Sequence, residues 1–108
     1  MPLEATLGGG WPVPPLSLML GMADIKDLQN MVQEIRQTMG TFRLSRPLES
    51  ELLGDLKTLE FQMASSKPDL HLVRHSLIPI RYILETIPTN NTAVRLIAHI
   101  SKFLIKHA

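Results

Sequence analysis

Apolar residues spaced three and four positions apart, in four successive segments, most constrain what this chain can fold into. The segments cover about residues 24–39, 48–64, 68–87 and 92–106. This spacing places the apolar side chains of each segment on one face of an α-helix, whereas a half-buried strand would alternate every second residue. Proline, glycine and short polar residues separate the segments, as in the run SSKPD. We predict an all-α domain, either a four-helix bundle or a set of antiparallel helical hairpins.

Residues that commonly start or stop helices mark the predicted helix ends. Asp24 is placed to cap the first helix, and Gly40 follows its last periodic residue, as a helix stop often does. Pro47 suits the first turn of the second helix, where its missing N–H is tolerated. Ser66 is the predicted N-cap of the third helix, and Pro88 ends that helix.

The third segment, LHLVRHSLIPIRYILETIP, carries the most regular apolar seam of the four. The seam residues are Leu70, Val73, Leu77, Ile80, Leu84 and Ile87. Pro79 interrupts this helix pattern, because it has no N–H to donate to the carbonyl of His75. We therefore expect a bend of more than about 20° between His75 and Pro79, with that carbonyl facing water or a partner.

Residues 1–22 differ in composition from the rest of the chain. They hold four of the six glycines and four of the eight prolines, with Glu4 as their charged side chain. This composition predicts a flexible leader, a disordered N-terminal tail, ahead of a helical domain over residues 23–108. From Met22 the chain reads MADIKDLQ, so a further hypothesis takes Met22 as the start of the native protein. The short apolar run before Met22 lacks the basic segment and the cleavage site of a secretory signal.

Composition argues against several classes of function. The formal net charge is +1, which gives no overall attraction to nucleic acid or to an acidic membrane. The chain has no cysteine, so disulfides, thiol chemistry and thiolate zinc sites are excluded. No apolar run approaches the roughly 18–20 residues of a membrane span. We expect a cytoplasmic protein.

Motifs for catalysis and metal binding are weak. His71 and His75 lie one helical turn apart, but both project away from the seam and no HExxH pattern accompanies them. No G-x-S-x-G motif occurs, and the carboxylates lie on faces that are otherwise polar. Glu60 and Glu85 are expected to pair with arginines of the third segment rather than to act as acids or bases. We predict no catalytic residue, no bound metal and no cofactor.

Apolar residues outside the seams are the stronger signal. The third segment carries apolar residues around most of its circumference. Four short helices of one chain cannot bury all of this apolar surface. We therefore predict a non-enzymatic module for helix-mediated protein–protein association, with self-association as the simplest case. The candidate interaction residues are Leu72, Arg74, Ile78, Arg81, Tyr82, Ile83, Ile97, Phe103 and Leu104. The alternative is a nucleic-acid-binding or antitoxin-like regulator that uses the arginine-bearing helix faces, with Arg74 and Arg81 as contacts.

The middle of the chain also carries a longer pattern, L-x-x-D-L-x-T-L-E-x-Q, then SSKPD, then V-R-x-S-L-x-x-I-R-x-I-L-E. The positions that carry it are Leu52, Asp55, Leu56, Thr58, Leu59, Glu60, Gln62, Val73, Arg74, Ser76, Leu77, Ile80, Arg81, Ile83, Leu84 and Glu85. This pattern resembles a helical segment found near the C-terminus of many uncharacterised bacterial proteins, and the resemblance covers about half of the chain. It implies a bacterial or phage origin and a helical accessory or oligomerisation module. Pro79 departs from the pattern, because it stands where a small polar residue is usual.

Overall fold

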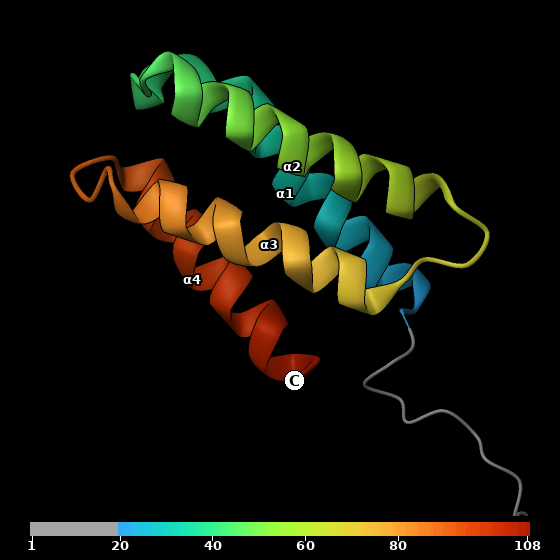
Figure 1. Cartoon of the computed structure of the whole chain (residues 1–108). Coiled ribbons are helices and arrows are strands. Elements are labelled where there is room, and N and C mark those ends of the chain that lie inside the picture. Colours follow the sequence, from blue (N-terminus) through green and yellow to red (C-terminus); the bar gives the residue numbers. More distant parts are fainter. Residues whose placement is uncertain (1–19) are drawn as a thin grey trace, which may run out of the picture.

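The computed structural model describes residues 20–108, which form four α-helices (Figure 1). They are α1 (Met22–Phe42), α2 (Arg46–Ala64), α3 (Leu70–Glu85) and α4 (Asn91–Lys106). Consecutive helices run in opposite directions and pack on each other, and α4 returns to contact α1. Over the described residues there is no strand, so the predicted all-α bundle is confirmed. The predicted flexible leader falls almost entirely on residues 1–19, outside the described part of the chain.

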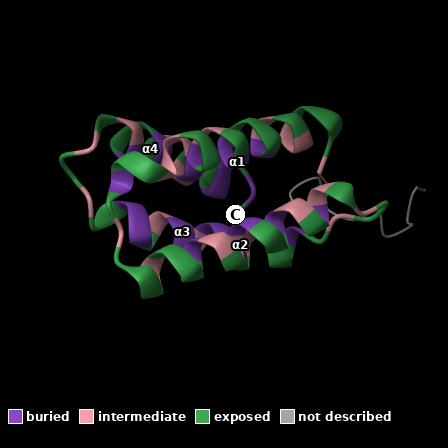
Figure 2. Cartoon of the chain, turned by 90° about the horizontal axis from the view of Figure 1, so that it is seen from above, coloured by how far each residue is buried: buried purple, intermediate pink, exposed green. Residues whose placement is uncertain are grey.

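The bundle has two layers. In Figure 1, α2 and α3 lie in front, with α1 behind α2 and α4 behind α3. Figure 2, which looks from above, shows the buried parts of the ribbons mainly on the sides where the two layers face each other. The outer side of α2 and α3 is mainly exposed in the same view. Each helix therefore buries one stripe and leaves the opposite side open, as its sequence pattern predicts.

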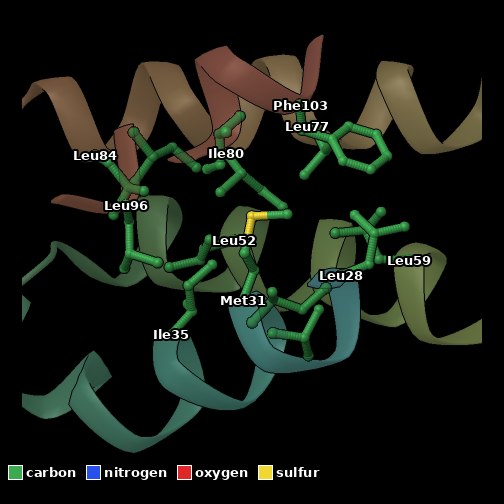
Figure 3. Packing of buried hydrophobic residues seen from close by; sticks show 14 of the residues in the cluster. Leu28, Met31, Ile35, Leu52, Leu59, Leu77, Ile80, Leu84, Leu96 and Phe103 are labelled. Carbon is green, nitrogen blue, oxygen red and sulfur yellow. The ribbon is translucent and has the colours of Figure 1, made fainter. Parts of the chain in front are cut away.

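The core draws side chains from all four helices. Figure 3 shows residues of α1 and α2 pointing across the bundle toward residues of α3 and α4. The large side chains of the core that are almost completely buried are Phe42, Leu28, Met31, Ile35, Leu52, Leu56, Leu59, Leu77, Ile80, Leu84, Leu96 and Ile100. Burial of one such side chain is worth about 1.5–3 kcal/mol relative to leaving it in water. The predicted seam of the third segment is confirmed from Leu70 to Leu84, while Ile87 lies beyond the helix and is half-buried.

The end of α1 differs from the sequence prediction. Gly40 does not stop the helix, which continues to Phe42 and ends at Arg43 in a left-handed conformation with φ of 52°. Phe42 is 2% exposed and belongs to the core. A glycine inside a helix destabilises it by about 1 kcal/mol relative to alanine. Burial of a phenylalanine side chain stabilises the folded chain by more than this. The tertiary contact of Phe42 therefore outweighs the local stop signal.

The start of α3 also differs in its cap. The N-cap is Asp69 and not Ser66, because the Asp69 carboxylate accepts from the backbone N–H groups of His71 and Leu72. The Asp69 N–H in turn donates to Oε1 of Gln62 at 2.8 Å. Gln62 is a buried polar residue of α2, so it fixes the α2–α3 connection through this bond. Pro47, in contrast, lies in the first turn of α2 as predicted.

Pro79 lies inside α3, and the helix continues without interruption on both sides of it. The seam residues before and after it, Leu77 and Ile80, are both fully buried. Packing of this seam holds the helix together where the backbone lacks one hydrogen bond. The expected bend between His75 and Pro79 stays a prediction.

Aspartate and glutamate side chains of α1 meet arginine, histidine and lysine side chains of α4. The pairs are Glu34 with Arg95, Asp27 with His99 at 2.7 Å, and Asp24 with Lys106 at 3.0 Å. Acidic residues thus come from α1 and basic ones from α4, at successive levels of two antiparallel helices. Each exposed pair of this kind adds up to about 1 kcal/mol to the free energy of unfolding. The pairs therefore set the alignment of α1 and α4 more than they stabilise the bundle.

Glu60 pairs across the bundle with α1 and not with α3. Its carboxylate accepts two hydrogen bonds from the guanidinium of Arg36, at 2.7 and 2.9 Å. These bonds lower the pKa of the Glu60 carboxyl below its usual value. The predicted pairing of Glu60 with an arginine of the third segment is therefore wrong, because α1 lies nearer to that side of α2.

Asp24 joins the start of α1 to the end of α4. One carboxylate oxygen accepts the N–H of Gly21 at 3.1 Å, and the other accepts from Lys106 and lies 3.2 Å from Nε2 of His107. Gly21 is the N-cap, and Asp24 closes the first turn by reaching back to it. Burial by itself would raise the pKa of Asp24. The hydrogen bonds from Lys106, Gly21 and His107 outweigh burial and lower the pKa below its usual 3.8.

Replacing Asp24 by asparagine is expected to lower the free energy of unfolding by about 1 kcal/mol at pH 7. Lys106 then loses its anionic partner, whereas the amide oxygen still accepts from Gly21. Because the pKa of Asp24 is lower in the folded state, its contribution is fully present above the ordinary pKa of 3.8. It is lost as the pH falls through the lowered pKa.

Urea unfolding of both proteins between neutral and acidic pH measures this difference. The two curves are expected to converge at acidic pH. Gln33→Asn, at an exposed uncharged position of α1, is the control, and its difference from wild type should not change with pH. A difference between wild type and D24N that persists at the acidic end would contradict the electrostatic origin.

Candidate interaction surface

The nine predicted interaction residues separate by burial. The core contains Ile83, Phe103 and Leu104, and the partly buried positions are Ile78 and Ile97. Leu72 and Tyr82 are exposed at 43% and 65%. The three core residues are thus occupied by contacts within the chain. Of the predicted apolar residues, Leu72 and Tyr82 remain as surface candidates.

Both arginines among the nine are directed to α4. Arg74 donates to the backbone carbonyl of His107 at 3.2 Å, beyond the end of α4. Arg81 donates to the hydroxyl of Ser101 at 3.3 Å. These bonds give the two arginines a role in holding α3 against α4. Binding of nucleic acid through them stays a prediction.

No three histidine, aspartate or glutamate side chains gather closely enough to hold a metal ion anywhere in residues 20–108. His71 and His75 are both exposed on α3 and point away from the core seam, as the sequence predicts. His99 and His107 face α1, where each lies beside an aspartate.

The outer side of the α2–α3 layer, which is mainly exposed in Figure 2, is called the α2–α3 face below. From α2 it contains Gly54, Thr58 and Phe61. From α3 it contains Leu72, His75, Pro79 and Tyr82. These residues lie on the sides of the two helices that the buried seams leave open.

The register between α2 and α3 follows from the bond between Gln62 and Asp69. Since the helices are antiparallel, each step back along α2 corresponds to one step forward along α3. Phe61, next to Gln62, is therefore level with the first turn of α3, where Leu72 lies. By the same rule Gly54 is level with the middle of α3.

Exposed apolar side chains concentrate on this face. Phe61, Leu72 and Tyr82 are 72%, 43% and 65% exposed. The other large apolar residues exposed in residues 20–108 are Met22, Val94 and Ile105, on α1 and α4. Half of the exposed large apolar side chains thus belong to one surface, whereas the rest are spread over the other layer. Phe61 was missed by sequence reasoning, because it stands alone on the polar side of its helix.

A hollow of about 320 Å³ lies at the end of this face opposite to Phe61. Its lining is Leu48, Glu51, Pro79, Tyr82, Ile83 and Thr86. The lining is mostly apolar, and Tyr82 forms one wall. A side chain of a binding partner therefore has a recess to enter at this end.

The middle of the α2 half of the face carries small side chains. Gly54 is exposed, and apart from its chain neighbours and the backbone of its own helix no described atom lies within 4 Å of the place where its Cβ would be. Thr58, one turn further along α2, turns its hydroxyl back to the carbonyl of Gly54 at 3.2 Å. Another helix could approach closely here, because neither residue projects a large side chain.

Two polar groups of α2 and α3 each lack a hydrogen bond. The carbonyl of His75 receives no helical N–H, because residue 79 is proline. Oδ2 of Asp55 is buried without a hydrogen-bond partner among the described residues. Burial, together with the nearby Glu51 carboxylate, raises the pKa of the Asp55 carboxyl. Because Oδ2 of Asp55 is buried within the chain, it is not open to a group from another molecule.

In comparisons with known proteins, the chain matched no family model, no curated protein and no solved structure. Over the described residues, no helix is long and apolar enough to cross a membrane.

Proposed function

We propose that this chain is a helical protein–protein association module that acts by binding, without catalysis, through its α2–α3 face. The observation that carries the proposal is the concentration of Phe61, Leu72 and Tyr82 on one surface beside a mostly apolar hollow. Exposed aromatic side chains next to a recess are the usual anchors of protein interfaces. Self-association is the simplest case, since symmetric dimers are the commonest assemblies.

The experiment compares two substitutions at similarly exposed apolar positions. Phe61→Asp places a charge on the α2–α3 face, and Ile105→Asp places one on α4, where Ile105 is 77% exposed. Sedimentation equilibrium over a wide concentration range gives the mass and the dissociation constant of each protein. We expect wild type and I105D to associate, and F61D to associate about tenfold or more weakly.

Circular dichroism confirms that both variants keep their helices. A wild-type chain that stays monomeric at the highest concentration would refute self-association. Equal weakening by both substitutions would refute the assignment of the face.

A further inference from the structure

We infer that a groove between α1 and α2 is the docking site of residues 11–19 of the same chain, which fold back from the start of α1 and lie along it. The groove lies on the side of α2 that meets α1, whereas the proposed binding function uses the α2–α3 face. The inference therefore goes beyond the proposed function and does not depend on it.

Two neighbouring hollows form the groove. The wider one, of about 510 Å³, lies between the start of α1 and the end of α2. Its apolar lining consists of Leu20, Met22, Ala23, Ile25, Met63 and Pro68. The second hollow, of about 390 Å³, continues along α1 as far as Arg36. Because Gln29 and Met63 line both hollows, the two are continuous, and each is as large as a site that buries a small ligand.

The chain enters α1 through the wider hollow. Leu20, the first residue that the structure describes, lines this hollow, is half-buried and packs against the core. Residues 1–19 are therefore attached at the mouth of the groove. A tethered segment is present at a millimolar effective concentration, and it does not lose the translational freedom that a separate partner loses on binding. The segment of the same chain is thus the favoured occupant.

The segment matches the groove in its chemistry. Residues 11–19 read WPVPPLSLM and contain no charged side chain. At the far end of the groove, Arg36 and Glu60 neutralise each other in an ion pair of 2.7 Å. Proline-rich segments dock in grooves through their apolar side chains and leave backbone carbonyls to be bonded. The side-chain amides of Gln29 and Gln33, which line the groove, supply N–H donors for such carbonyls.

The segment also has the length that the groove requires. At about 1.5 Å per residue, α1 covers about 21 Å from Met22 to Arg36. Nine residues in a polyproline conformation span about 28 Å, so Trp11 reaches the second hollow and leaves length for the chain to reverse before α1. Docking there gives the indole ring an apolar contact with Val32 and gives its N–H an acceptor in the side chain of Gln33.

Fluorescence of the full chain tests the inference, because Trp11 is the one tryptophan of the sequence. Tryptophan emission moves to shorter wavelength when the ring leaves water. Met22→Asp and Gln29→Glu each place a charge in the groove at an exposed position, where no core contact is lost. Ile105→Asp is the control at an exposed apolar position of α4. Circular dichroism checks that each protein keeps its helices.

We expect wild type and I105D to emit at shorter wavelength in buffer than in urea. M22D and Q29E are expected to lose most of this shift, because a charge is costly to bury against an apolar segment. Acrylamide should also quench the emission of M22D and Q29E more strongly than that of wild type.

The same measurements can overturn the inference. Wild-type emission that is equal in buffer and in urea would mean that Trp11 does not dock. A shift that persists in both M22D and Q29E would place the segment outside the groove. A shift that disappears on dilution would mean that the groove holds the segment of a second copy. None of these outcomes bears on the proposed function, because Met22 and Gln29 belong to α1 and not to the α2–α3 face.

Discussion

Replacing Ile100 by alanine is expected to lower the free energy of unfolding by about 2–5 kcal/mol. Ile100 is fully buried in α4, the helix that packs on α3 and closes the bundle against α1. The substitution removes apolar contacts and leaves a cavity that neighbouring side chains fill only partly. A loss of this size is a large share of the total stability of a domain this small.

Ile105→Ala is the matched control for this change. It is the same substitution in the same helix, at a side chain that is 77% exposed. We expect a change within about 0.5 kcal/mol, since no core contact is lost. Urea unfolding followed by circular dichroism measures both variants. Similar losses at the two positions would contradict the placement of Ile100 in the core and of Ile105 on the surface.

Replacing Pro79 by alanine is expected to raise the free energy of unfolding by about 2 kcal/mol. A proline inside a helix is about 3 kcal/mol less favourable than alanine, because it lacks an N–H and crowds the preceding turn. Proline also restricts the conformations of the unfolded chain. Removing that restriction stabilises the unfolded state by about 0.4–1 kcal/mol, which reduces the expected gain. The gain from the new hydrogen bond to the carbonyl of His75 is larger, since α3 is continuous around Pro79.

Thermal and urea unfolding at concentrations where the chain is monomeric test this prediction. Hydrogen exchange at the new amide of position 79 gives a second measure, because protection shows that the amide bonds to His75. Pro47→Ala is the control. Pro47 lies in the first turn of α2, where a backbone N–H would have no partner within the helix, so its proline removes no hydrogen bond. A P79A protein that is less stable than wild type would mean that the packing of α3 requires the proline bend.

The sequence predicts the helices well because their signal is local and repeated. The seam from Leu70 to Leu84 recurs over four helical turns, and a chain can bury such a stripe only by folding it as a helix. Helix ends are predicted less well, since single residues compete there with tertiary contacts. Gly40 is a helix stop by itself, but burial of Phe42 extends α1 past it.

The candidate surface is predicted only in part. Leu72 and Tyr82 stand out in the sequence as apolar residues outside the seam of α3, and both are exposed. Phe103 and Leu104 carry the same sequence signal but are buried, because α4 presents a broader side to α3 and α1 than a single seam. Sequence periodicity gives the direction of a side chain around its own helix, and burial depends on which helices lie in that direction.

The sequence by itself determines that this chain forms four amphipathic helices with short connections, because helical periodicity and turn residues act over a few positions. The tertiary structure alone decides which acidic residue meets which basic one. Asp24 joins residues from opposite ends of the domain, and Glu60 bonds to Arg36 rather than to α3. It also decides that Phe61 and Leu72, in different helices, lie level on one face. Such pairings depend on the order and register of packed helices, which no local pattern contains.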